Sequence, residues 1–391
     1  MEVRTVAEIN SYQTVIINPM EQPDQTFELY SVPSFDNQHP EIIKGSEIGS
    51  TKVAVEEGDV LICKINPRIN RVWVVKHFTE YPLLASSEWI VVRNREIESS
   101  YLKWYFSSPT FRNLITSQVA GIGGSLTRAQ PKQVAKYPVP IPEKSEQKRI
   151  VFILDKVSNL ISLRKQQLAK LDELVKARFV ELFGDPIDNP KGLPVKTLKE
   201  LSTLITNGNT PKGGSENYVD NGILFLRSQN IWRNRIELDD VAYIDEATHR
   251  SLKKSSLKHK DILITKTGRI NTENSSLGRA ALYLGADDSA NINGHVYLVR
   301  LDGSVVPEYV VTILTSEAYR KYIRKVCVGG IDKRQINLDQ VEDFPIILPS
   351  VEMQEQFAAF VKQTDKSKVV VQKALDEAQL LFDSLMQQYF G

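Results

Sequence analysis

The chain has few of the residues that build cross-linked or metal-bound folds. It contains only two cysteines, Cys63 and Cys327, and five scattered histidines among 391 residues. The cysteines lie in different halves without metal-ligand spacing, which argues against a disulfide scaffold and a zinc site and favours a reducing compartment. We therefore expect both thiols in the hydrophobic core, and no bound metal.

Long apolar runs are also missing. No stretch near eighteen residues is continuously apolar, and the amino terminus lacks a basic segment followed by an apolar one. These absences argue against a membrane span and a secretion signal. The expected location is the cytoplasm.

The motifs of familiar enzymes are absent as well. The sequence has no GxxxxGK(S/T) phosphate loop, no dinucleotide fingerprint, no HExxH and no GxSxG. It also lacks the Asn/Asp-Pro-Pro-aromatic tetrapeptide of amino-methyltransferases, because Asn66-Pro67-Arg68 and Asn189-Pro190-Lys191 have no second proline and no aromatic residue. We expect no catalytic residues and no cofactor bound by this chain.

What the sequence does contain is an internal repeat. Residues 137–184 return as residues 344–391, without a gap and at a constant offset of 207. Identities are few, among them Pro142 with Pro349 and Gln147 with Gln354, but the apolar pattern persists throughout. Such a match is typical of diverged repeats, so the chain is a tandem duplication.

Each copy of the repeat contains a long amphipathic helix with apolar residues three and four positions apart. This spacing predicts a coiled-coil seam. The alternatives are a helical bundle or a generic dimerisation coil, but two matched helices in one chain can satisfy each other. The predicted seam residues are Ile150, Leu154, Val157, Ile161, Leu168, Leu171, Val175, Leu182, Phe357, Val361, Val371, Leu375, Phe382, Leu385 and Tyr389.

A globular block precedes each helix, and the repeat extends weakly into it. GDVLICK (58–64) matches KDILITK (260–266), and both predict a buried strand. Residues 101–112 match 309–320 and predict one helix in each block, followed by glycine loops that start at Gly121 and Val328. We expect an α+β fold, with two α/β blocks and two long coiled-coil helices in an internal repeat.

The expected segments are therefore four. They are a first block (1–143), a first helix (144–184), a second block (185–349) that begins with the linker 185–194, and a second helix (350–391). Three prolines and two glycines between Gly184 and Pro194 break the first helix and mark the boundary. The first helix is the covalent connection between the blocks, so its length should set their separation.

Local charge is more informative than the total, which is only +1. Residues 61–76 and 112–136 each hold four basic residues and no acid, and 247–279 hold eight basic residues against two acids. Residues 320–334 add six against one. Such clusters are often solvated faces, but here they repeat, and asparagine and glutamine are interleaved with them. Arginine pairs with guanine and these amides with adenine, so the mixture favours reading of DNA bases.

The candidate DNA-contacting residues lie after the predicted strand and in the glycine loop of each block. In the first block they are Lys64, Asn66, Arg68, Asn70, Arg71, Arg128, Gln130 and Lys132. In the second block they are Lys266, Arg269, Asn271, Asn274, Arg279, Lys333, Arg334, Gln335 and Asn337.

Taken together, these features resemble the specificity (S) subunit of type I restriction-modification systems. The resemblance covers essentially the whole chain: the GDVLI and KDILI strands, the glycine loops, the proline stretches, the Glu146-Gln147 and Met353-Gln354 steps, and the closing Phe-Gly pairs. It implies that the blocks are target-recognition domains and that the helices are conserved spacers. The two long helices would pair antiparallel as a coiled coil and hold the blocks apart, with an internal pseudo-two-fold axis. The two blocks would read a bipartite sequence in double-stranded DNA.

The resemblance also implies partners. Methyltransferase (M) subunits, two of them, and restriction (R) subunits would carry adenine-N6 methylation and ATP-dependent cleavage. S-adenosylmethionine, ATP and magnesium would bind those partners and not this chain. Two other functions remain open: a coiled-coil scaffold without sequence-specific DNA binding, and an enzyme with an unfamiliar site. DNA binding against salt distinguishes the scaffold, which would show little salt dependence and no sequence preference.

Overall fold

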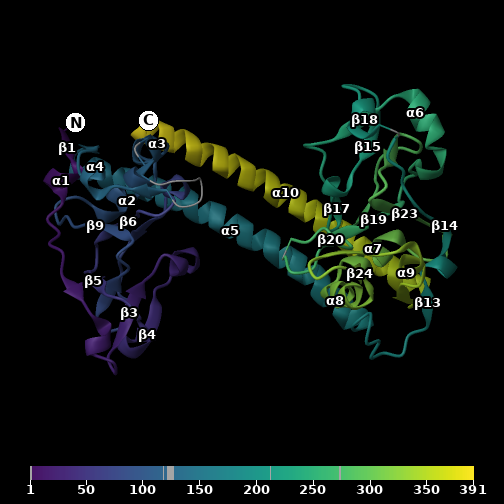
Figure 1. Cartoon of the computed structure of the whole chain (residues 1–391), viewed down its shortest axis with the longest axis horizontal. Helices are drawn as coiled ribbons and strands as arrows, with labels where there is room; N and C mark the ends of the chain where they lie inside the picture. Colours follow the sequence, from purple (N-terminus) through teal and green to yellow (C-terminus); the bar gives the residue numbers. More distant parts are fainter. Residues whose placement is uncertain (1, 118, 121–126, 212, 273) are drawn as a thin grey trace. The chain divides into compact units, whose positions relative to one another are not determined.

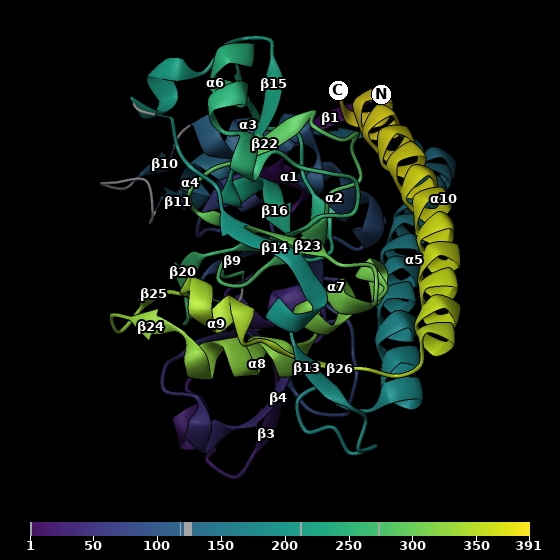
Figure 2. The ribbon, with the colours of Figure 1, turned by 90° about the vertical axis from the view of Figure 1, so that its right-hand side faces the viewer.

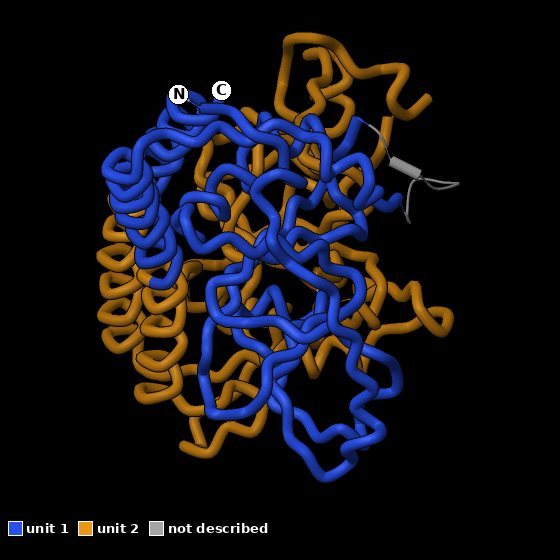
Figure 3. Tube along the Cα trace, turned by 90° about the vertical axis from the view of Figure 1, so that its left-hand side faces the viewer, with its two compact units in different colours: residues 1–166, 372–391 blue, residues 167–371 orange. Residues whose placement is uncertain are grey.

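A computed structural model describes residues 2–117, 119–120, 127–211, 213–272 and 274–391 (Figure 1). The chain divides into two compact units, residues 1–166 with 372–391, and residues 167–371 (Figure 3). Each unit holds one globular block and one half of each long helix. This division differs from the four expected segments because the apolar faces of the helices belong to the cores of the blocks.

Unit 1 is built on a five-stranded sheet of order β2-β5-β8-β3-β4 and a three-stranded sheet of order β7-β6-β9. Two further pairs are β1-β12 and β10-β11. Its strands are β1 (Glu2–Thr5), β2 (Ile16–Ile17), β3 (Thr26–Tyr30), β4 (Glu41–Lys44), β5 (Lys52–Ala54), β6 (Val60–Cys63), β7 (Val72–Val74), β8 (Leu83–Ala85), β9 (Trp89–Val92), β10 (Val119–Ala120), β11 (Arg128–Ala129) and β12 (Pro138–Ile141). Its short helices are α1 (Val6–Ile9), α2 (Ser99–Ser107), α3 (Pro109–Ser117) and α4 (Pro131–Val134).

Unit 2 contains sheets of order β14-β23-β19-β21, β18-β15-β22 and β20-β25-β24, with the pairs β13-β26 and β16-β17 (Figure 2). Its strands are β13 (Val195–Thr197), β14 (Ser202–Asn207), β15 (Ile223–Leu226), β16 (Ile231–Trp232), β17 (Arg235–Ile236), β18 (Ala242–Ile244), β19 (Ile262–Thr265), β20 (Thr267–Arg269), β21 (Ala280–Leu282), β22 (Ala290–Ile292), β23 (Val296–Leu301), β24 (Val328–Gly329), β25 (Lys333–Gln335) and β26 (Pro345–Ile347). Its short helices are α6 (Glu246–Ser251), α7 (Pro307–Thr315), α8 (Glu317–Val326) and α9 (Leu338–Glu342). Both blocks thus mix helix with sheet, as the sequence predicted.

The two matched apolar runs are confirmed as buried strands. Every residue of β6 and of β19 is buried, and each lies at the centre of its sheet between two antiparallel neighbours. A strand that is covered on both faces has a continuous apolar sequence and not an alternation of apolar and polar residues. The two strands could therefore be predicted from their apolar runs.

The predicted helix at 101–112 and 309–320 is instead a pair of helices in each unit. Ser108 separates α2 from α3, and Ser316 separates α7 from α8. The Ser108 hydroxyl accepts a hydrogen bond from the N–H of Phe111, and that of Ser316 accepts one from Tyr319. A serine that caps a second helix competes with continuation of the first, so the chain turns there.

The proline-rich segments are extended, as predicted, and each forms an antiparallel pair. β12 pairs with β1, and β26 pairs with β13. Two-stranded ribbons tolerate prolines because every strand is an edge. Of the two predicted glycine loops, Val328–Gly329 forms β24, whereas residues 121–126 lie outside the described residues.

The two long helices are α5 (Lys144–Phe183) and α10 (Val351–Phe390). In unit 1, Val157 and Ile161 of α5 cluster with Ala378 of α10. In unit 2, Phe179 of α5 clusters with Phe357 of α10. Early residues of one helix meet late residues of the other in both units, so the local pairing is antiparallel. All the predicted seam residues are buried or half-buried.

A buried glutamine ties each helix to its own block. The side chain of Gln147 donates to the carbonyl of Pro142 at 2.9 Å and accepts from the N–H of Glu98 at 3.0 Å. Gln354 repeats both bonds, to Pro349 at 2.9 Å and from Val306 at 3.0 Å. The accepted N–H belongs to the N-cap residue of α2 or α7. The glutamine therefore fixes the angle between two helices.

The opposite end of each helix closes the other core. Phe183 of α5 packs in unit 2 on Tyr309, with ring centroids 5.1 Å apart. Phe390 of α10 packs in unit 1 on Tyr101, with centroids 5.6 Å apart. None of the helices in the described part of the chain has the length and apolarity needed to cross a bilayer.

We predict that Gln147→Ala lowers the free energy of unfolding of unit 1 by about 1–3 kcal/mol, because it leaves a buried N–H and a buried carbonyl without partners. Urea unfolding followed by tryptophan fluorescence measures this, since all the tryptophans but Trp232 lie in unit 1. Gln166→Ala, an exposed glutamine of the same helix, is the control and should be neutral. Equal midpoints for the two variants would contradict the proposed role.

Candidate nucleic-acid interface

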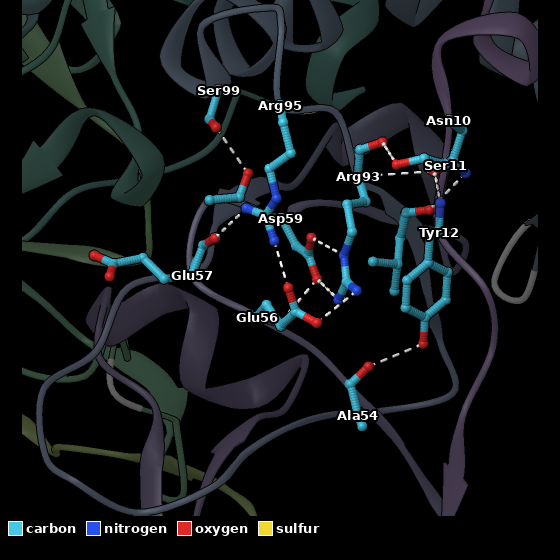
Figure 4. A network of polar contacts seen from close by, with 12 residues as sticks. Asn10, Ser11, Tyr12, Ala54, Glu56, Glu57, Asp59, Arg93, Arg95 and Ser99 are labelled. Atoms are coloured by element: carbon cyan, nitrogen blue, oxygen red, sulfur yellow. Dashed lines mark hydrogen bonds and ion pairs between the residues drawn. The ribbon is translucent and has the colours of Figure 1, made fainter.

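In each unit the candidate interface follows a buried strand whose start is anchored by an ion pair. Arg93 donates from Nε and Nη2 to the two oxygens of Asp59 at 2.8 and 2.7 Å (Figure 4). Arg300 binds Asp261 in the same way at 2.9 and 2.7 Å. The aspartates are 0% and 2% exposed, so water barely screens either pair. The hydrogen bonds to Asp59 raise the pKa of Arg93.

Each aspartate also closes the turn before its strand. The Asp59 carboxylate accepts the N–H of Glu56 at 2.8 Å, and that of Asp261 accepts the N–H of Lys258 at 2.6 Å. One buried carboxylate thus satisfies backbone and guanidinium donors together. The pair fixes where β6 and β19 begin, and hence where each strand delivers the residues at its far end.

The first candidate residues follow directly after these strands. The carbonyl oxygen of Lys64 accepts from the N–H of Ala129 at 2.9 Å, and that of Lys266 accepts from the N–H of Ile336 at 2.9 Å. Segments far apart in the sequence therefore meet through the same hydrogen bond in both units. The strand-end and loop residues predicted separately lie side by side.

The next residues along also correspond. Gln130 is the N-cap residue of α4 and Asn337 is that of α9. Gln130 and Lys132 are exposed, whereas Asn337 is half-buried and its own backbone N–H donates to the side chain of Gln340. Both units thus share one backbone arrangement, in which a strand that starts at a buried Arg–Asp pair is joined at its far end to a second segment. We call this arrangement the frame. The two units present different side chains on it.

In unit 2 the frame carries a basic ladder. Arg269 of β20 lies directly opposite Lys333 of β25. The Arg269 side chain is 69% exposed, and its Nε lies 3.4 Å from Oδ2 of Asp332. Like charges opposite each other in an antiparallel ladder repel, and one exposed carboxylate offsets only part of that repulsion. A bound anion would remove the rest.

A polar cavity of about 460 Å³ opens beside this ladder. Three cationic side chains line it, those of Arg269, Arg279 and Lys333, and among its described lining residues there is no carboxylate. Its hydroxyl groups come from Thr267, Thr272, Ser275 and Ser276. Cations with hydroxyl donors in a concave polar surface suit phosphate oxygens or the acceptor edge of a base.

Arg279, a candidate DNA contact, presents little of its charge to solvent and reaches the surface only at the wall of this cavity. It is 8% exposed, and its guanidinium donates to the carbonyls of Ser275 at 3.0 Å and Asn274 at 2.5 Å. It also lies 3.8 Å from the centroid of the Trp232 ring. Arg279 therefore forms the floor of the cavity and holds the loop above it.

The remaining candidates of unit 2 surround this floor. Asn271 and Asn274 are exposed in the loop between β20 and β21. Lys266 is half-buried, with its Nζ 5.7 Å from the centroid of the Tyr297 ring. Two others hold the β24–β25 turn and its continuation: Arg334 donates to the carbonyl of Gly330, and Gln335 donates to Asn337.

In unit 1 the corresponding loop carries unpaired amides. Asn66 and Asn70 both adopt left-handed backbone conformations, with φ of 48° and 54°. Their side-chain oxygens and Nε of Arg71 are buried without hydrogen-bond partners among the described residues. Nε of Arg71 lies 3.9 Å from Asp36, a weak contact. Unsatisfied buried polar atoms are rare and costly, so these groups are poised for a ligand or water.

The other candidates of unit 1 are more exposed. Arg68 projects from the same loop. Arg128 is 58% exposed and donates to Glu88 at 3.0 Å. This pair holds β11 against the segment before β9 without burying the charge.

Sequence reasoning missed the anchoring pairs and the hairpin β16–β17, whose Trp232 packs on Arg279. The anchors had a weak signal, since Arg93 and Arg300 follow matched apolar strands at the offset of 207. Both cysteines are in the core, as predicted, and burial raises the pKa of the Cys63 thiol. The described ranges bring together no cluster of three potential metal ligands.

The sequence matches a known protein family in both halves. Residues 2–173 and 190–378 match the type I restriction modification DNA specificity domain, once in each half. The chain belongs to this family. The two matches coincide with the two blocks and reach well into both long helices.

Several type I specificity subunits are similar in sequence. The chain is 23% identical over 304 residues to the StySPI specificity subunit of Salmonella potsdam, covering 74% of this chain but only 64% of that subunit. It is 22% identical over 348 residues to the MjaVIII specificity subunit of Methanocaldococcus jannaschii, covering 84% and 79%.

Solved structures of type I systems share the fold. The S subunit from M. genitalium aligns with a TM-score of 0.56 at 12% identity, covering 100% of this chain and 96% of that one. A chain from a study of complex assembly and conformational transition of the type I R-M system aligns with a TM-score of 0.58 at 17% identity, covering 100% and 97%. At such identities the likeness concerns the fold alone.

We predict that Asp59→Ala lowers the free energy of unfolding of unit 1 by about 1–3 kcal/mol, because the half-buried guanidinium of Arg93 loses its two bonds to Asp59 and keeps only the one to Glu56 at 2.7 Å. Asp59→Asn, which keeps one acceptor, should cost less. Glu2→Ala breaks the exposed pair with Arg4 in the same unit and should leave the unfolding midpoint unchanged. Urea unfolding of the three variants measures the difference, and a neutral Asp59→Ala would refute the anchor.

Proposed function

We propose that this chain is the DNA sequence-recognition subunit of a type I restriction-modification complex. It reads a bipartite target in double-stranded DNA through its two blocks and performs no catalysis itself. Membership of the DNA specificity family, with one domain match in each half, supports this function.

The observation that carries the proposal is the repeated frame with unlike side chains. Both units anchor a strand with a buried Arg–Asp pair and join its far end to a second segment through the same backbone bond. On that frame unit 1 holds two buried amide oxygens without partners among the described residues, and unit 2 displays a basic ladder. A constant frame with variable contacts suits two readers of different half-sites.

The helices would serve assembly. We infer that α5 and α10 form an antiparallel coiled coil along their length, supported by the packing of their halves in each unit and by the ion pair of Lys368 with Asp172 at 2.7 Å. Exposed apolar side chains remain on the outer faces of the helices, such as Leu163 at 61% and Leu380 at 71%. These faces would bind two methyltransferase subunits, which bring S-adenosylmethionine, and restriction subunits, which bring ATP and magnesium.

We predict that the host loses adenine methylation at one bipartite motif when this chain is deleted, and recovers it when the chain is restored. Methylome sequencing measures this directly. Exchanging residues 195–343 for the block of a relative should then change one half of the motif, which assigns that half to unit 2. An identical methylome with and without the chain would contradict the function, and change in both halves would contradict independent reading.

We predict that Arg269→Ala weakens binding to the motif by about 1–3 kcal/mol if Arg269 contacts a base, and relaxes only the half-site of unit 2. Lys196→Ala, which removes an exposed cation from β13, is the matched control. Equilibrium binding of the purified chain to matched and random duplexes distinguishes the roles. Equal weakening on both duplexes would make Arg269 a phosphate contact.

A further inference from the structure

Unit 2 carries a second group of cations, on a hairpin that the candidate interface did not include. In β16–β17, Trp232 pairs with Arg235 and the two-residue tip is Arg233-Asn234. Asn234 takes a φ of 57°, which a tight turn requires and asparagine tolerates. Arg233 and Arg235 are exposed at this tip.

The hairpin is fixed to the core of unit 2. The N–H of Asn234 donates to the carbonyl of Ala280 at 2.8 Å, which docks the tip on β21. At its base, the buried carboxamide of Asn230 donates to the carbonyls of Glu237 at 3.1 Å and Asp240 at 2.7 Å. A tip held at both ends presents its side chains with little loss of entropy on binding.

An aromatic ring stiffens the hairpin further. The guanidinium of Arg279 lies 3.8 Å from the Trp232 centroid, and that of Arg235 lies 5.3 Å from it. Both distances fall within the range of a cation–π contact. Burial, and then repulsion from Arg233, lowers the pKa of Arg279.

Two acids that follow the hairpin, Glu237 and Asp240, bind other side chains. Glu237 accepts two bonds from Arg235, at 2.9 and 2.7 Å. Asp240 accepts from Arg227 at 2.9 Å and from Gln229 at 2.5 Å. Arg233 forms no ion pair with any residue that the structure describes. The N–H donors of its planar guanidinium are therefore available to an acceptor on a ligand.

Arg279 joins this hairpin to the candidate interface. The same side chain that packs on Trp232 forms the floor of the cavity between Arg269 and Lys333. The tip of the hairpin and the β20–β25 ladder are therefore supported by one buried residue. A ligand bound to the ladder meets the hairpin as part of the same rigid body.

We propose that the β16–β17 hairpin is a second base-reading element of unit 2, with Arg233 as its specificity-determining residue. The inference rests on the proposed function and deepens it. A guanidinium without an ion pair among the described residues, on a tip that Arg279 connects to the cavity beside the basic ladder, matches the N7 and O6 acceptors of guanine in the major groove of duplex DNA. Trp232 and Arg279 position the tip without contacting the base.

The test uses the full chain and duplexes that carry its methylation motif, with one half-site randomised at a time. Sequencing of the bound fraction measures the preference of each variant. Arg233→Ala should lower affinity for the intact motif about tenfold or more and flatten the preference at one or two positions of the half-site of unit 2. Arg233→Lys keeps the charge but not the planar fork, so it should bind random duplex like the unaltered chain and still lose the preference.

Arg178→Ala removes the same charge from an exposed site on α5 and serves as the control. The hairpin proposal is overturned if Arg233→Ala behaves like this control, if it weakens motif and random duplexes equally, or if it alters the half-site of unit 1. Thermal unfolding of each variant checks that the exposed tip is not structural. If the unaltered chain shows no preference in either library, the proposed function itself fails, and that outcome is distinct from an unchanged Arg233→Ala.

Discussion

Neither long helix can bury its apolar face alone, and the cores of this protein are built around that constraint. The core of unit 1 contains Leu154 from α5 and Phe390 from α10, while that of unit 2 contains Phe183 from α5 and Phe357 from α10. Each helix begins on its own block and ends in the core of the other. Burial of a phenylalanine contributes roughly 1.5–3 kcal/mol, so either block without the far helix would lose a substantial part of its stability. Folding of each block therefore depends on correct pairing of the helices.

Apolar burial alone does not fix how the helices meet the blocks, because many packings satisfy it. The buried polar groups add direction. Gln147 and Gln354 each hold a helix start to a neighbouring N-cap through two bonds, and Asp59 and Asp261 each hold a turn and an arginine. A misdocked helix or a shifted strand would leave these groups buried without partners, at about 1–3 kcal/mol each and more for the charges. The same two positions, the glutamine and the aspartate, recur in both halves, although most of the surrounding sequence differs.

The sequence was sufficient for features that repeat with a short period or at a constant offset. The helices, the strands β6 and β19 and the extended proline segments all belong to this class. The Asp–Arg anchors escaped because their partners are 34 and 39 residues apart, and because the aspartates differ by 202 positions while the arginines differ by 207. Loops of unequal length between the partners hid the match.

Charge was the least reliable guide. Arg279 stands in a basic run, as an exposed contact would, yet tertiary packing on Trp232 and the loop carbonyls buries it. Arg233 stands beside acids that suggest a neutralised surface, yet those acids bind Arg227, Arg235 and Gln229. Local sequence gives the charges but not their partners, since an ion pair forms wherever the fold brings two groups together.

The near-neutral total charge bears on how such a surface would work. A strongly basic protein binds any duplex, because release of counterions from phosphates favours every site equally. With a net charge of +1, a DNA-recognition subunit of the proposed kind would gain little from the long-range attraction of the whole chain and would rely on its local cations. Contacts to base edges then make up a larger share of the binding free energy, so the ratio of specific to non-specific affinity rises. A reader with two half-sites benefits in particular, because neither half would hold the chain on random DNA for long. The duplicated frame adds little charge. Its buried Arg–Asp pairs fix the two strands, and the strands in turn determine where a few cations lie.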